Sequence, residues 1–69
     1  MELIANMAGS VWKVNAKVGD IVEAGETVVI LESMKMEIPL EVESAGEIAE
    51  ILVAEGDFIN EGDRVLVIK

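Results

Sequence analysis

Residues 19–31 read Gly-Asp-Ile-Val-Glu-Ala-Gly-Glu-Thr-Val-Val-Ile-Leu, and residues 56–68 read Gly-Asp-Phe-Ile-Asn-Glu-Gly-Asp-Arg-Val-Leu-Val-Ile. Both stretches begin with Gly-Asp, carry a second glycine six positions later and end in an apolar run. A shift of 37 positions superimposes them, and the match extends without a gap over almost the whole chain. The shift aligns Ala8-Gly9 with Ala45-Gly46, Leu3 with Leu40, Ala5 with Val42, Val11 with Ile48 and Val14 with Ile51.

Each copy of this repeat has the pattern of β-structure, because short apolar runs rich in β-branched residues alternate with turn-forming pairs. No stretch shows a sustained helical period. We expect glycines to supply positive φ in the turns at Gly19, Gly25, Gly56 and Gly62. The expected strands are Glu2–Asn6, Ser10–Val14, Ile21–Val22, Thr27–Ser33, Met36–Glu43, Glu47–Val53, Phe58–Ile59 and Arg64–Lys69.

The repeat predicts one all-β domain, residues 1–69, with half-repeats of about 1–32 and 38–69. Two copies are too few for a solenoid, which needs about three. Neither copy alone can cover its apolar face and its strand edges, whereas two copies facing each other can. We therefore predict a flattened β-barrel, or barrel-sandwich, of two four-stranded antiparallel sheets related by a pseudo-two-fold axis. The chain ends should lie at one end, and the link Glu32–Ile38 at the other.

The composition excludes several kinds of functional site. The 69 residues include no cysteine, so disulfides, zinc-thiolate sites and cysteine nucleophiles are excluded. They include no histidine, which removes the usual general base and the commonest metal ligand. We therefore expect a non-catalytic chain with no catalytic residues and no metal site.

The charge and the apolar pattern bear on partners and location. Fourteen acidic residues against five basic ones give a net charge of -9, which would repel nucleic acid phosphates. A protein partner should instead present a neutral or basic surface. No run of 18 apolar residues is present, and the first ten residues lack the basic region of a signal peptide. We expect no membrane contact and a cytoplasmic location.

The link between the copies reads Glu32-Ser33-Met34-Lys35-Met36-Glu37. A hairpin tip usually carries Gly, Asn or Asp, so Met-Lys at this place breaks a local rule, as functional sites often do. The neutral lysine amine is a nucleophile that can form an amide with an activated carboxylate. Lys35 extended by a cofactor's acyl chain would make a neutral arm of about 14 Å.

This junction resembles that of the biotinyl/lipoyl attachment domain family, and its Ser33-Met34-Lys35-Met36 is similar to the Ala-Met-Lys-Met of the biotin type. Lipoyl domains typically have Asp before the lysine and Ala after it, and this chain has neither. The framework of Gly19-Asp20, Gly25-Glu26 and Ala45-Gly46 also fits, so the resemblance covers essentially all 69 residues.

The resemblance implies a carrier of covalently attached biotin on Lys35. A biotin protein ligase would join biotin to the lysine by an amide bond. A biotin carboxylase would then carboxylate the cofactor, and a carboxyltransferase would pass the carboxyl group to an acceptor. Met34 and Met36 match the flanking positions that the family uses for recognition. The carrier would make no bonds of its own, because the cofactor carries the chemistry.

The resemblance is to the small stand-alone members of the family. Many biotin domains follow a Pro/Ala-rich linker, and some bacterial ones carry an insertion between the second and third strands. This chain starts almost at its first expected strand, and Val14 to Asp20 leaves no room for the insertion. These features leave the carboxylase that it would serve undetermined.

Two other functions remain open from the sequence. The same lysine could carry lipoate instead of biotin, or the domain could accept both. Alternatively, the chain could be an unmodified protein-interaction module, with Lys35 an ordinary surface lysine. Met34 and Met36 could instead pack in the core, and Trp12 could be an aromatic residue of the core or its rim. Glu32 and Glu37 are expected to be solvated flanks of the hairpin rather than an acid–base pair.

Overall fold

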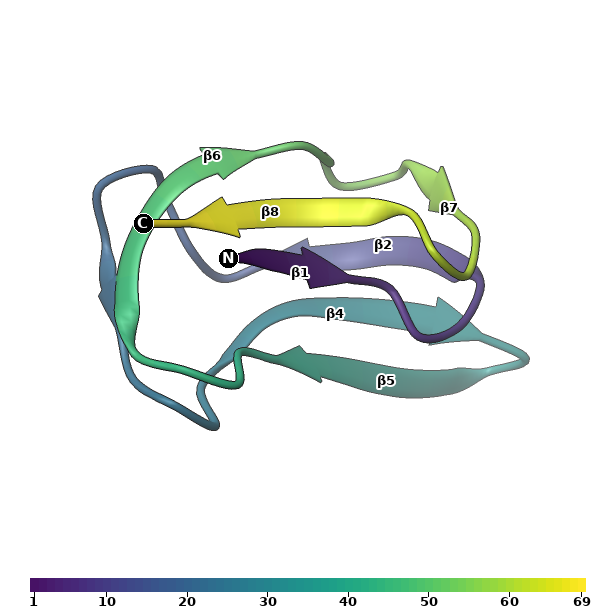
Figure 1. The fold of residues 1–69 in the computed structure, drawn as a ribbon. Coiled ribbons are helices and arrows are strands. Elements are labelled where there is room, and N and C mark those ends of the chain that lie inside the picture. The colour runs from purple at the N-terminus through teal and green to yellow at the C-terminus, as the bar shows by residue number, and fades with distance from the viewer.

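The computed structural model describes residues 1–69, which form eight β-strands and no helix (Figure 1). The strands are β1 (Glu2–Ile4), β2 (Gly9–Val14), β3 (Ile21–Val22), β4 (Thr27–Ser33), β5 (Met36–Glu41), β6 (Gly46–Ile51), β7 (Phe58–Ile59) and β8 (Arg64–Ile68). All eight expected strands are present, and three of them have the predicted bounds, namely β3, β4 and β7.

The strands form two four-stranded antiparallel sheets, with the orders β1-β8-β6-β3 and β5-β4-β2-β7. Exchanging the two half-repeats converts one order into the other, since β1 corresponds to β5, β2 to β6, β3 to β7 and β4 to β8. The all-β fold of two pseudo-symmetric sheets is thereby confirmed. We call the first sheet the terminal sheet, because it holds both chain ends, and the second the hairpin sheet.

The turns of the two halves repeat the same hydrogen bonds. The backbone N–H of Gly19 donates to Ile48 O and that of Gly56 to Val11 O, both at 2.8 Å. Both glycines have positive φ, at 95° and 94°. Three residues before each following aspartate, a backbone N–H donates to the Oδ2 of Asp20 or Asp57 at 2.9 Å. The repeated Gly-Asp pair therefore builds the same turn twice, with glycine supplying the left-handed residue and aspartate an acceptor.

Fourteen apolar residues form the core between the sheets, and no polar or charged residue is buried. Twelve of them are six repeat-related pairs: Ala5 with Val42, Val11 with Ile48, Val22 with Ile59, Val28 with Val65, Val29 with Leu66 and Leu31 with Ile68. The other two are Ala16 and Leu40, whose counterparts Val53 and Leu3 are partly buried. Each half therefore supplies half of a shared core, and one half alone would leave its apolar face uncovered.

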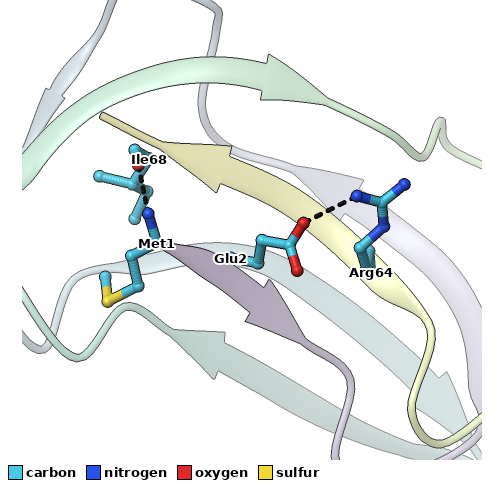
Figure 2. A network of polar contacts seen from close by, with 4 residues as sticks. All are labelled: Met1, Glu2, Arg64 and Ile68. Carbon is cyan, nitrogen blue, oxygen red and sulfur yellow. Dashed lines mark hydrogen bonds and ion pairs between the residues drawn. The ribbon is translucent and has the colours of Figure 1, made fainter.

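The chain ends meet in the terminal sheet, away from the β4–β5 hairpin (Figure 1). The Met1 ammonium donates to Ile68 O at 2.7 Å, and the Arg64 guanidinium pairs with Glu2 at 2.7 Å (Figure 2). The hydrogen bond to Glu2 and its negative charge raise the pKa of Arg64. These contacts fix the ends at the side of the molecule opposite the hairpin tip, as the repeat predicts.

Candidate attachment site

The tip of the β4–β5 hairpin consists of two residues, Met34 and Lys35. Ser33 and Met36 are the last cross-strand pair, so the loop between them has the shortest common length. Met34 has φ 52° and Lys35 has φ 66°. Positive φ at both central residues is the requirement of a type I′ turn, whose twist matches that of the flanking strands.

This turn is made without the residues that ordinarily make it. Every other residue of the chain with positive φ is a glycine. A side chain in the left-handed region costs roughly 1–2 kcal/mol, because its Cβ approaches the following carbonyl oxygen. The hairpin tip therefore holds a methionine and a lysine where an Asn-Gly pair would fold more easily.

The side chains at the tip project into solvent. Met34 is 92% exposed and Met36 is 64% exposed, so the alternative that they pack in the core is wrong. Lys35 is also exposed. The single ion pair of the molecule joins Arg64 to Glu2, and no hydrogen bond involves the Lys35 ammonium. The amine is therefore free to enter the active site of another protein.

Two carboxylates flank the tip. Glu32 lies directly opposite Glu37 in the hairpin, and both are exposed. Their solvated position agrees with hairpin flanks rather than with an acid–base pair, which would need a pocket. No pocket in the molecule is lined by Lys35, Glu32 or Glu37. The tip can thus present an amine, but it cannot enclose a substrate.

Trp12 lies at the rim rather than in the core. It is 44% exposed, and the Lys13 Nζ lies 5.8 Å from the centroid of its ring. The register between β2 and β4 shifts between Val11 and Lys13, which makes Trp12 the extra residue of a β-bulge. Its repeat counterpart Ala49 occupies the same place in a matching shift between β6 and β8.

The rest of the molecule offers few other sites. No group of three or more His, Cys, Asp or Glu residues is arranged to hold a metal ion. The chain contains no helix long and apolar enough to cross a bilayer.

One group of exposed residues was not predicted from the sequence, because its members come together only across the sheet. Phe58, Ser10 and Glu32 lie in one row of the hairpin sheet.

Comparison with protein families gives one match over nearly the full length. The family described as "Biotin-requiring enzyme" matches residues 2–68. A "Biotin/lipoyl attachment protein" of Bacillus subtilis (strain 168) is 52% identical over 66 residues, which cover 96% of this chain and 90% of that protein. This chain is therefore similar in length as well as in sequence to a small curated protein.

Longer proteins contain a similar segment. A "Biotin carboxyl carrier protein" of Streptococcus mutans is 39% identical over 93% of this chain, which spans 49% of that protein. The crystal structure of the Kluyveromyces lactis urea carboxylase superimposes with a TM-score of 0.94 at 40% identity, and the match covers 100% of this chain but 6% of that one. The two-sheet architecture thus recurs as one small part of a large carboxylase.

Proposed function

We propose, because the chain belongs to the biotin/lipoyl attachment family, that it carries biotin on Lys35 and shuttles carboxyl groups between a biotin carboxylase and a carboxyltransferase. The observation that carries this proposal is the free amine of an exposed lysine on a type I′ turn that glycine would ordinarily make. The names of the relatives support biotin, since they include a biotin carboxyl carrier protein and a urea carboxylase.

The Lys35 site fits an amide-linked group. The neutral Nζ attacks an activated carboxyl carbon, the leaving group departs, and the nitrogen loses a proton, so the positive charge of the lysine disappears. The linkage needs an accessible amine and no pocket, which is what the tip offers. Bound biotin would supply a ureido ring that accepts and releases a carboxyl group.

The protein's own contribution is positioning. The lysine side chain and the acyl chain together reach roughly 14 Å from the backbone, counting about ten bonds. The two sheets act as a rigid handle, because their core is closed by six symmetric residue pairs. Met34 and Met36 flank the arm with flexible apolar side chains, and we propose that partner enzymes recognise them.

The carboxylase and transferase activities are proposed to reside on other chains or domains. The relatives differ in how much chain they have beyond the matching segment, since this chain spans 90% of the Bacillus protein but 6% of the urea carboxylase. We propose a non-catalytic carrier subunit that serves separate enzymes. Because ligation and carboxylation both consume ATP, we propose that these encounters occur in the cytoplasm. The net charge of -9 favours partners with basic docking surfaces.

Intact-mass measurement tests the proposal. The chain is incubated with a purified biotin protein ligase, ATP and biotin, and its mass should rise by one biotin less one water. Lys35→Arg keeps the charge and must abolish the adduct, whereas Lys17→Arg should be modified normally. A parallel reaction with a lipoate ligase and lipoate tests the other cofactor. An unmodified chain in the first reaction, or an adduct that survives Lys35→Arg, would contradict the proposal.

A further inference from the structure

Phe58 has a large apolar side chain that is exposed on the surface of the molecule. It is 66% exposed, and it is one of only two aromatic residues in the chain. It begins β7, the edge strand of the hairpin sheet, and lies directly opposite Ser10 of β2. Ser10 in turn lies opposite Glu32, and Glu32 opposite Glu37. Residues opposed in this way share one face of a sheet, so these four form a hairpin-end row on its outer surface.

The pseudo-symmetry of the molecule supplies an internal comparison for this row. The counterpart of Phe58 is Ile21, which begins β3 and is 73% exposed. Ile21 lies opposite Glu47, and the backbone N–H of Lys69 donates to Glu47 O at 2.8 Å. The backbone pairing is therefore the same at both ends of the molecule. The counterpart row has an aliphatic residue in place of the aromatic one, Glu47 in place of Ser10, and a lysine in place of Glu32.

One other exposed apolar residue, Leu52, lies on the side of Phe58. Phe58, Leu52 and Arg64 line one shallow hollow with neighbouring residues of the β6–β7 and β7–β8 loops. Leu52 is 40% exposed, and its counterpart in the other half is the polar Asn15. The other end has its own second exposed apolar residue, Val18, which is 63% exposed and whose counterpart beside Phe58 is Glu55. The hairpin end is therefore distinguished by an aromatic residue in place of an aliphatic one, and an exposed aromatic residue points to a contact outside the molecule.

We propose that Phe58 is the anchor by which the biotin protein ligase docks on this carrier, in an apolar pocket of the ligase whose cationic rim faces Glu32 and Glu37. This inference rests on the proposed function. The ligase meets the carrier before any cofactor is attached, so only protein surface is available for recognition. The later enzymes can also bind the cofactor itself. Exposed aromatic residues commonly act as such anchors, and the acidic row selects a basic rim.

The size of the hairpin tip supports a contact that extends beyond it. A stable protein interface buries about 800 Å² on each partner, and the two-residue loop with its flanking methionine cannot supply this area. The outer face of the hairpin sheet is continuous with the tip through Glu32. Phe58 is the large apolar side chain of that row, and a buried Phe contributes about 150–250 Å².

Steady-state biotinylation tests the inference, with the ligase in fixed amount and the carrier varied. Phe58→Ala should lower kcat/KM about 10- to 100-fold, mainly through a higher KM, because docking and not chemistry is impaired. Ile21→Ala removes the counterpart side chain and should stay within about twofold of the unsubstituted chain. Phe58→Leu keeps an apolar anchor and should lie between them. Thermal melts of each variant report whether folding is intact, and Phe58→Leu carries the test if Phe58→Ala does not fold.

The outcomes separate this inference from the proposed function. Normal loading of both Phe58 variants, while the unsubstituted chain is biotinylated on Lys35, would overturn the inference and leave the carrier function intact. Equal losses in Phe58→Ala and Ile21→Ala would also overturn it, since they would report a general effect. If loading is normal but a purified biotin carboxylase uses loaded Phe58→Ala poorly, the face serves a later partner and the assignment to the ligase is wrong. Failure to load the unsubstituted chain would overturn the proposed function and this inference together.

Discussion

Ser33 and Met36 lie opposite each other as the last pair of the β4–β5 ladder, and this single pairing decides what the tip can be. It leaves two residues to reverse the chain, and both must adopt positive φ. The lysine therefore stands at the outermost point of the hairpin with its backbone held by strands on both sides. Local geometry makes Lys35 accessible and reproducible in position.

Replacing the tip by the residues that a type I′ turn prefers should stabilise the fold. Met34→Asn keeps Lys35 and should raise the free energy of unfolding by about 1 kcal/mol, because Asn tolerates the left-handed region better than Met. Urea denaturation measures the change. Met36→Asn is the matched control, since Met36 lies in a strand, where Asn is disfavoured. A lower midpoint for Met34→Asn would contradict the strain argued for this turn.

Reversing one of the opposed charges should also stabilise the hairpin. Glu37→Lys replaces a like-charge pair with Glu32 by an attractive one, and should contribute roughly 0.2–1 kcal/mol. The gain should shrink in about 1 M salt, where exposed charges are screened. Glu41→Lys lies opposite the neutral Thr27 and should gain less. Equal gains for the two variants would show that the net charge, rather than this pair, is responsible.

The two glycines that begin β2 and β6 should differ in their tolerance of a side chain. A Cβ at Gly46 would overlap Ile68 Cγ2 and come within 2.9 Å of Lys69 O. Gly46→Ala should therefore destabilise the fold by about 1–3 kcal/mol. At the counterpart Gly9 the nearest atom is Glu32 O at 3.0 Å, and Gly9→Ala should cost less. Thermal unfolding compares them, and a larger loss for Gly9→Ala would contradict this order.

The turn aspartates should behave as equivalents. Asp20 accepts a hydrogen bond from the Lys17 N–H and Asp57 from the Ala54 N–H, both at 2.9 Å. We expect Asp20→Ala and Asp57→Ala each to lower stability by about 0.5–1.5 kcal/mol, with the two losses close to each other. Chemical denaturation of the single variants and of the double variant measures this. Strongly unequal losses would show that the pseudo-symmetry of the bonds does not extend to their energies.

Much of this fold could be predicted from the sequence because most of the core residues are apolar residues that match between the two repeats. Alignment of Val11 with Ile48 and of Leu31 with Ile68 places apolar residues on matching faces, and these residues are buried. The ends of some strands could not be predicted. The register shifts beside Trp12 and Ala49 depend on the neighbouring strand, so a single strand's pattern does not reveal them.

The candidate site was likewise predictable only in part. Lys35 could be singled out because it interrupts the repeat and breaks the composition rule for a hairpin tip. The row that includes Phe58 could not, because it is defined by contacts between strands β7, β2 and β4, which lie far apart in the sequence. In the repeat, Phe58 aligns with Ile21, and nothing in that alignment of two apolar residues signals exposure beside the tip.

The hydrogen bonds that join Met1 to Ile68 close a gap that the other half of the molecule bridges with the hairpin. By the 37-residue shift, Lys69 stands where Glu32 stands and Met1 where Ile38 stands. The backbone would thus form a closed ring if a second hairpin joined its two ends. Inserting Ser-Met-Lys-Met-Glu between Lys69 and Met1, with a new opening in the β2–β3 turn, should give a circular permutant with two arms pointing in opposite directions.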